Sequence, residues 1–131
     1  MITGAHFLLY SSDPAADQAA LERILGTRSV PAQPGRIILA LPPAEIATHT
    51  GSGDFTQRHA DRDLLGLVLY LMCDDLPSVV RELEQLGIPC TGIEEAEFGL
   101  KTTVRLPGGG EIGLYQPSHE TALESRAVPG R

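Results

Sequence analysis

Tryptophan is absent from this 131-residue chain, and aromatic residues make up only 5% of it. Lysine and arginine form no cluster, and the formal net charge is −7. A negative chain without a basic patch does not attract nucleic acid or an anionic membrane surface, so we expect neither as a partner. The longest apolar run, residues 64–73, is too short to span a bilayer. The N-terminus also lacks the basic start and apolar segment of a signal peptide, which predicts a cytoplasmic protein.

Cysteine is scarce as well, with only Cys73 and Cys90. Both residues fall in segments that are predicted to be strands. Disulfides persist in oxidising compartments, and the chain shows no sign of export. We therefore expect two unpaired, buried thiols. With 42% apolar residues, the chain is the length of one domain and can bury a core.

The most informative feature that is present is an internal repeat. In the first half, residues 5–10 lead into Asp13 and an Ala/Leu-rich stretch. In the second half, residues 67–72 lead into Asp75 and a second stretch with helical periodicity. Both halves then close with Leu-Pro followed by Glu-Ile. A duplicated unit of this length indicates two similar modules that pack together.

Each half is predicted to form a β-α-β-β-β unit. In the first unit we expect a strand at 5–11, a helix at 15–25, a weakly marked strand near 28–30, and strands at 36–41 and 45–49. In the second unit we expect a strand at 65–73, a helix at 77–86, strands at 88–93, 100–106 and 111–116, and a loop at 94–99. Asp13-Pro14 suits the start of the first helix, because Asp accepts from free amides and Pro fits the first helical position.

The polar stretch 51–63 falls between the two units and is predicted to be a linker. Residues 1–117 then form a single domain whose modules span 3–50 and 64–117, and residues 118–131 form a flexible tail. One helix cannot cover both faces of a module's sheet, so the other face must meet the second module or a second chain. This predicts an α+β fold in which two curved sheets surround a cavity, with the helices outside.

Several of these features resemble the vicinal oxygen chelate superfamily, which contains glyoxalases, bleomycin-resistance proteins and extradiol dioxygenases. They are the repeated unit, His6 seven residues before Asp13, the Asp-Asp-Leu helix start at 74–76, and the closing sequence at 106–117. Three segments look like small single-domain bacterial members of the dioxygenase-like type: 41–47, 69–75 and 105–117. The resemblance covers residues 3–117 and implies the fold described above.

The resemblance implies one divalent metal held by four residues, namely a His on the first strand and a carboxylate on the last strand of each module. Such a ligand set with an open position polarises adjacent oxygens of a substrate. His6 matches the first position. Val68, Ala47 and Gly113 stand at the other three and offer no lone pair. A single His does not hold a divalent cation, so we expect no metal cofactor at the family position.

Nearby polar residues leave an alternative open. Residues two apart on a strand share a face, so His49 lies on the side of Ala47 and Glu111 on the side of Gly113. His6, His49 and Glu111 would then bind Fe, Zn, Mn or Ni, and the chain would be a metal-dependent lyase or an extradiol-type dioxygenase. Against this, each two-residue step moves a side chain by about 6–7 Å along its strand, and the two steps run in opposite directions.

The favoured interpretation is a glyoxalase/bleomycin-resistance-like protein that binds a small organic molecule in the sheet cavity and has a degenerate metal site. Tyr10, Tyr70 and Met72 share a strand face with His6 and Val68 and are expected to line the cavity, although the same residues would suit a plain core. The candidate ligand-binding set is His6, Tyr10, His49, Tyr70, Met72 and Glu111. Whether the chain is an enzyme stays open between the two interpretations.

The expected protein partner is a second copy of the chain. A module this small exposes one sheet face, and members of the superfamily often close the cavity by pairing modules between chains. His59 and His119 fall in the predicted linker and tail, so we expect both to be solvent-exposed. The Gly108-Gly109-Gly110 run lacks the helix and lysine that a phosphate-binding loop requires and is predicted to be a hairpin turn.

Overall fold

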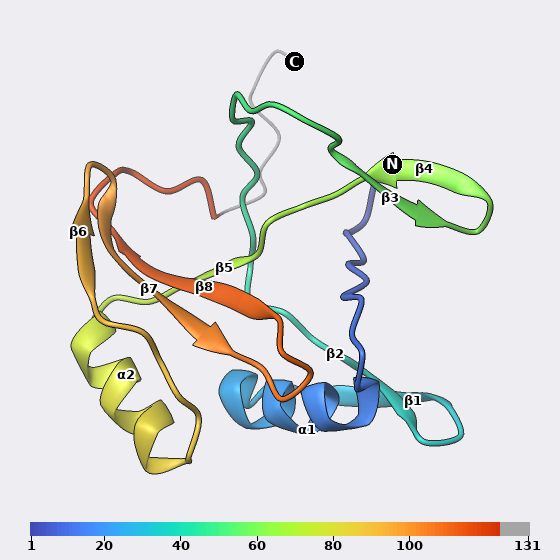
Figure 1. Ribbon diagram of the computed structural model, residues 1–131, viewed down its shortest axis with the longest axis horizontal. Coiled ribbons are helices and arrows are strands. Elements are labelled where there is room, and N and C mark those ends of the chain that lie inside the picture. The colour runs from blue at the N-terminus through green and yellow to red at the C-terminus, as the bar shows by residue number, and fades with distance from the viewer. Residues whose placement is uncertain (124–131) are drawn as a thin grey trace.

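A computed structural model describes residues 1–123 and has an α+β architecture, which confirms the predicted fold class (Figure 1). The elements, in chain order, are α1 (Pro14–Leu25), β1 (Ser29–Gln33), β2 (Arg36–Leu39), β3 (Thr56–His59), β4 (Arg62–Leu65), β5 (Tyr70–Met72), α2 (Leu76–Gln85), β6 (Glu94–Ala96), β7 (Gly99–Arg105) and β8 (Glu111–Pro117). β1 pairs with β2, β3 pairs with β4, and the other four strands form a sheet in the order β5-β8-β7-β6. Within residues 1–123 the sheets do not close into a barrel.

In the second module α2 packs on one face of the four-stranded sheet, and the predicted helix and last two strands are present (Figure 1). β5 runs parallel to β8, and β7 runs antiparallel to it. Alternate residues of β7 and β8 point to the same face, which places Val104, Ile112 and Leu114 in the core. They cluster with Leu76 and Leu83 of α2, and both Leu76 and Val104 are fully buried.

The two helices begin as the repeat predicts. The Asp13 side chain accepts from the Ala16 amide at 3.3 Å, and the Asp75 side chain accepts from the Ser78 amide at 3.3 Å. A Pro lies in the first turn of each helix. α1 ends at Gly26, which adopts a left-handed φ of 59° while its amide donates to the Glu22 carbonyl. The same local chemistry therefore starts the helix in both halves of the chain.

The cap at Asp75 predicts an acid-dependent loss of stability. Hydrogen bonds from the Ser78 side chain and amide lower the pKa of the Asp75 carboxyl. A lowered folded-state pKa stabilises the fold above the unfolded pKa of about 3.9, and this contribution is lost as the pH falls through the folded-state value. We expect Asp75→Asn to flatten the fall in melting temperature between about pH 4 and pH 2. Asp74→Asn, on the exposed neighbouring residue, is the control, and an equal flattening in both variants would contradict the cap.

Two predicted strands of the first module differ from the structure. Residues 5–11 and 45–49, all within the described range, lie outside any strand, whereas β1 and β2 form close to their predicted positions. Strand-forming residues such as Phe7 and Ile46 favour an extended backbone, but a strand also needs a neighbour for its amides and carbonyls. The single chain does not supply that neighbour to these two segments.

The segment 51–63, which is predicted to be a linker, contains most of a β-hairpin. β3 and β4 pair from Thr56↔Leu65 to His59↔Arg62. Ala60 and Asp61 both have positive φ, which is typical of the tight two-residue turns of hairpins. The hairpin stands apart from the four-stranded sheet (Figure 1). It is exposed on both faces, so it lacks the alternating apolar pattern that marks a strand in a sequence.

Three boundaries in the second module also differ. The first strand covers only residues 70–72 rather than 65–73, because Leu65 pairs within the hairpin. The strand expected at 88–93 is reduced to a bridge between Cys90 and Val104, since Pro89 has no amide to extend the pairing. The loop expected at 94–99 instead contains β6, which pairs with β7. Only residues 118–123 of the predicted tail are described, and the rest lie outside the described residues.

Both cysteines are free, as predicted, but they are half-buried rather than fully buried. Burial raises the pKa of the Cys73 thiol, and the neighbouring Asp74 carboxylate raises it further. Burial also raises the pKa of the Cys90 thiol. Both therefore remain protonated and poorly nucleophilic at neutral pH. In residues 1–123, neither helix has the length and apolar character needed to cross a membrane.

A buried carboxylate joins the two halves of the chain. Asp17 of α1 is only 4% exposed. One oxygen accepts from the Gly108 amide at 2.7 Å, in the turn between β7 and β8, and the other accepts from the Ser11 hydroxyl at 2.5 Å. The Ser12 hydroxyl donates to the Gly108 carbonyl at 2.7 Å. The glycine run is therefore a hairpin turn, as predicted, and it also docks α1 against the second module.

Candidate functional site

The face of the four-stranded sheet opposite α2, which we call the open face, carries the candidate site. Tyr70 of β5 lies in register with Gly113 of β8, and Met72 lies in register with Tyr115. Paired residues point to the same side of a sheet, and the intervening residues Ile112 and Leu114 point into the core. Tyr70, Met72, Gly113 and Tyr115 therefore share the open face.

Three aromatic rings meet on this side of the sheet from three different elements. The rings of Tyr70 and Tyr115 lie edge to face, with centroids 5.4 Å apart and planes at 87°. Phe98, in the turn between β6 and β7, lies 5.7 Å from Tyr115 with planes at 86°. Tyr70 and Phe98 are 38% and 42% exposed. These residues form the aromatic cluster, which holds half of the six Phe and Tyr residues of the chain.

The ring of Tyr70 covers the position where the superfamily resemblance places a metal-ligating carboxylate. A Cβ atom at Gly113 would overlap the Tyr70 ring, with Cγ 2.8 Å away and two further ring carbons still closer. A carboxylate side chain at this position would therefore need the space that Tyr70 fills. The residues present do not fit the family metal, because this position offers an aromatic face where the ion requires an oxygen or nitrogen lone pair.

Polar groups surround the hydroxyl of Tyr115 at the centre of the cluster. His119 Nδ1 lies 2.7 Å from the backbone carbonyl oxygen of Glu120, so Nδ1 carries the proton and donates to that carbonyl. His119 Nε2 then accepts from the Tyr115 hydroxyl at 3.2 Å. Burial raises the pKa of Tyr115, and the Glu45 carboxylate raises it further. The phenol therefore stays protonated and acts as a hydrogen-bond donor at neutral pH.

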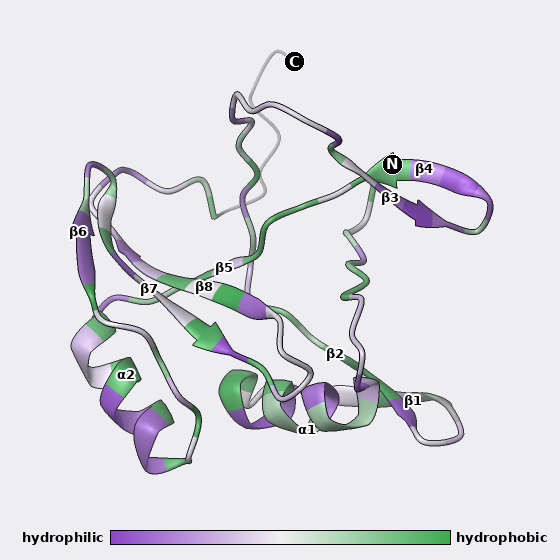
Figure 2. Ribbon diagram, in the orientation of Figure 1, coloured by the Kyte–Doolittle hydropathy of each residue, from purple (hydrophilic) through white to green (hydrophobic). Residues whose placement is uncertain are grey.

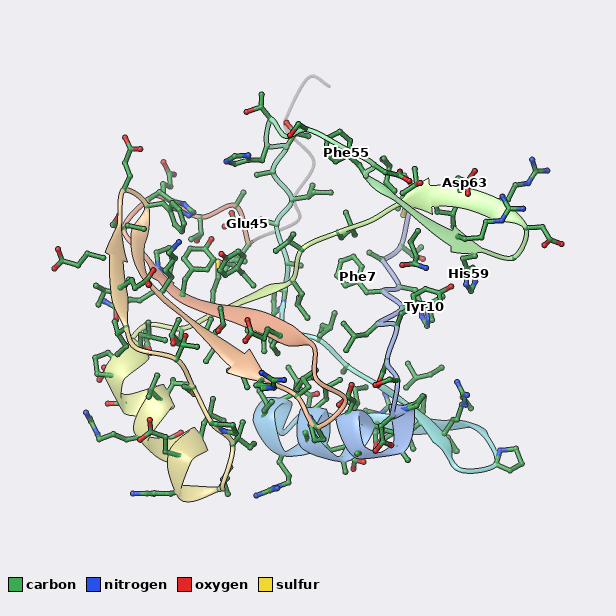
Figure 3. The ribbon with its side chains drawn as sticks, in the orientation of Figure 1. Phe7, Tyr10, Glu45, Phe55, His59 and Asp63 are labelled. Carbon is green, nitrogen blue, oxygen red and sulfur yellow. The ribbon has the colours of Figure 1, made fainter. Side chains whose placement is uncertain are left out.

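Glu45 reaches this cluster from the first module. Its carboxylate accepts from the Ala122 amide at 2.9 Å, so it connects the 41–50 segment to the residues that follow β8 (Figure 3). Glu45 is half-buried, whereas Glu111, its match across the repeat, is exposed at the start of β8. The two glutamates are thus equivalent in sequence but not in environment.

The candidate residues chosen from the sequence are only partly brought together. Tyr70 and Met72 lie on the open face, whereas Tyr10 contacts the hairpin through the Arg58 carbonyl, at 3.4 Å, and through His59 Nδ1 (Figure 3). His6 and His49 are exposed, and the His49 Nδ1 lies 2.6 Å from the Thr50 carbonyl. Across residues 1–123, no three His, Cys, Asp or Glu side chains come together as a metal site. The alternative triad of His6, His49 and Glu111 is therefore not assembled in the single chain.

Sequence reasoning missed four members of the site: Glu45, Phe98, Tyr115 and His119. A signal for Tyr115 was present, because it lies two residues after Gly113 on the same strand and so shares its face. Phe98 and His119 follow strands in turns, where no periodicity predicts a direction. His119 is exposed as expected, yet it contacts Tyr115.

A shallow groove lies beside the cluster at the end of the sheet. It has a volume of about 280 Å³, and its walls include Ala96, Gly99 and Pro117. A larger open groove of about 650 Å³ lies between α1 and the β1–β2 hairpin, with Pro31 and Ile37 in its wall. Only the first adjoins the aromatic cluster, since the Ser118 amide in its wall donates to the Phe98 carbonyl at 2.8 Å.

Similarity to known proteins is found at the level of structure. Neither a protein-family model nor a curated protein matches the sequence. An antibiotic binding protein from a Streptomyces species is 21% identical, with a TM-score of 0.53 over 90% of this chain and 100% of the other. A lactoylglutathione lyase from Agrobacterium tumefaciens is 19% identical, with a TM-score of 0.52 over 82% and 88%. A glyoxalase/bleomycin resistance protein from Streptomyces is 20% identical, with a TM-score of 0.50 over 81% and 93%.

Proposed function

We propose that this chain, which has the fold of the vicinal oxygen chelate superfamily, is a binding protein for a small organic molecule with an aromatic or apolar body. The aromatic cluster on the open face is the observation that carries this proposal. In a chain with 5% aromatic residues, three rings from separate elements gather at one place and stay partly exposed. Aromatic walls with a few polar groups are the usual lining of small-molecule sites.

The chemistry of the cluster supports this role. Tyr70 and Phe98 offer flat apolar surface to a ligand at low entropic cost, because a ring has few rotatable bonds. Tyr115 offers a protonated hydroxyl, and Glu45 and His119 supply acceptors around it. Such a site can bury an aromatic ring and orient it through one or two hydrogen bonds.

The proposal involves no metal. Three of the four residues at the family positions, Val68, Ala47 and Gly113, lack donor atoms, and Tyr70 fills the space in front of Gly113. The similarity to an antibiotic binding protein supports a binding role, although at 21% identity it establishes only the fold. The similarity to a lyase carries no separate argument, because the side chains on the open face do not reproduce a metal site.

Binding of 2-naphthol, a planar aromatic probe, tests the proposal by calorimetry. We expect Tyr70→Leu to weaken binding at least tenfold, because it removes a ring of the cluster, and Tyr115→Leu to do the same. Tyr10→Leu is the matched control, since Tyr10 contacts the hairpin and is not in the cluster. Equal losses in Tyr10→Leu and Tyr70→Leu would contradict the proposed site, as would an affinity that no Tyr substitution changes.

A further inference from the structure

The open face of the four-stranded sheet divides into an aromatic part and a polar part. Tyr70 and Tyr115 lie on β5 and β8, whereas β7 presents Lys101, Thr103 and Arg105 to the same face. These three residues are in register with residues 115, 113 and 111 of β8, and paired residues point to the same side of a sheet. Figure 2 shows most of β6, which lies beyond β7 at the end of the sheet, as hydrophilic. The character of the open face therefore changes between β8 and β7.

Lys101 lies at this boundary and is the single lysine of the chain. It stands directly opposite Tyr115 in the β7–β8 pair. Residues that face each other in this way have Cβ atoms about 4.5–5.5 Å apart, so the lysine side chain starts next to the aromatic cluster. Lys101 is half-buried, whereas Arg105, the other cation of this row, is exposed. The open face thus places one partly buried positive charge beside its aromatic rings.

The positive charge of Lys101 has no carboxylate partner within residues 1–123. In this part of the chain an ion pair forms only between Arg58 and Asp63, in the β3–β4 hairpin. Glu94 of β6 is in register with Lys101 on the side away from Tyr115, but it is exposed and forms no ion pair with the lysine. Withdrawing a charge from water is costly unless the charge is paired. A bound anion would supply the partner that Lys101 lacks.

A negative charge lies at the other end of the Tyr115 side chain. Register places Lys101 beside the backbone end of Tyr115, whereas the Glu45 carboxylate lies near its hydroxyl, where burial and then this carboxylate raise the pKa of the phenol. The Glu45 carboxylate also accepts from the Ala122 amide at 2.9 Å. Opposite charges at the two ends of one ring give a charged ligand a preferred direction, because an anion is attracted to Lys101 and repelled by Glu45.

We propose that the ligand is an aromatic carboxylic acid, bound as its anion, with its ring on the aromatic cluster and its carboxylate on Lys101. This inference rests on the proposed binding function and adds the charge of the ligand to it. Neighbouring strands lie about 4.8 Å apart, so a carboxylate attached directly to a ring over β8 reaches the row of Lys101 on β7. A hydrogen bond between an ammonium and a carboxylate is about twice as strong as one between neutral groups. Lys101 is therefore the residue that selects an acid over a neutral molecule of the same shape.

Calorimetry with three probes that share one ring system tests the charge of the ligand. At neutral pH 2-naphthoate is an anion, 2-naphthol is neutral and 2-naphthylmethylamine is a cation. We expect the full chain to bind 2-naphthoate about tenfold more tightly than 2-naphthol, and to bind the amine most weakly. Lys101→Met removes the charge and keeps most of the length of the side chain, so it should abolish the preference for 2-naphthoate. Lys101→Arg keeps the charge and should retain most of that preference.

Arg62→Met is the matched control, because it removes the same unit of charge from the exposed β3–β4 hairpin, which forms a separate sheet. It should leave the preference for 2-naphthoate intact. Equal affinities of the parent for the three probes, or tightest binding of the amine, would overturn the inference and leave the aromatic site in place. An equal loss of preference in Lys101→Met and Arg62→Met would overturn the role of Lys101. Binding of none of the probes would contradict the proposed function itself, and this inference with it.

Discussion

Replacing Gly113 with alanine is expected to destabilise the fold and to abolish binding of an aromatic probe. The added Cβ would overlap the ring of Tyr70, which lies directly opposite in the β5–β8 pair. Gly113 is buried between paired strands, so the ring must swing away from the sheet. Overpacking of this kind costs about 1–3 kcal/mol of the free energy of unfolding. When the Tyr70 ring moves away, it also loses its contact with Tyr115, and the aromatic cluster is disrupted.

A double-mutant cycle separates the overlap with Tyr70 from any other effect that an alanine at position 113 has on the free energy of unfolding. Tyr70→Ala removes the ring, so Gly113→Ala should cost much less in that background, with a coupling energy of about 1–3 kcal/mol. Gly92→Ala is the control, because a Cβ there meets no atom within 4 Å. Additive costs in the double variant, measured by urea unfolding, would show that Tyr70 does not occupy the space in front of Gly113.

Removing the buried carboxylate of Asp17 is expected to have the largest effect on the packing of α1 against the second module. Asp17→Ala leaves the Gly108 amide and the Ser11 hydroxyl without their acceptor. Both donors belong to half-buried residues, and a donor left unsatisfied in this way costs about 1–3 kcal/mol of the free energy of unfolding. Asp17→Asn keeps one acceptor oxygen for Gly108 and should cost less than Asp17→Ala.

The glycine on the other side of this contact gives an independent test. At Gly108 a Cβ would lie 2.7 Å from Asp17 Oδ2 and 2.9 Å from Ser11 Oγ, whereas at Gly110 it would meet nothing within 4 Å. Gly108→Ala should therefore lower the melting temperature clearly, and Gly110→Ala should leave it nearly unchanged. Similar melting temperatures for the two variants, or for Asp17→Ala and the parent, would contradict the role of this contact.

The absence of family metal ligands has a structural counterpart on the open face. In the sequence, Gly113 stands where the superfamily resemblance implies a metal-ligating carboxylate. In the structure it is the residue that allows the Tyr70 ring to lie across the strand. Restoring a carboxylate at this position would thus displace an aromatic side chain as well as add a ligand. The same position therefore connects the lack of metal donors to the proposed binding of an aromatic molecule.

The sequence by itself determined where both helices begin. Asp13 and Asp75 start helices because a side-chain oxygen satisfies amides only a few residues away, and the following Pro residues fit the first turn. The Gly108-Gly109-Gly110 run likewise predicts the hairpin turn between β7 and β8. These features depend on neighbours close in sequence or on a simple period, so they can be read without knowing the fold.

Only the tertiary structure decided which residues form the site and which segments remain unpaired. Tyr70, Phe98 and Tyr115 come from three elements, and register and turn direction bring them together. The strand-forming residues of 5–11 form no strand within the described chain, because strand formation requires a partner backbone. Pairing and ring contacts depend on residues far away in sequence, so propensity alone could predict extended segments and aromatic candidates but not their neighbours.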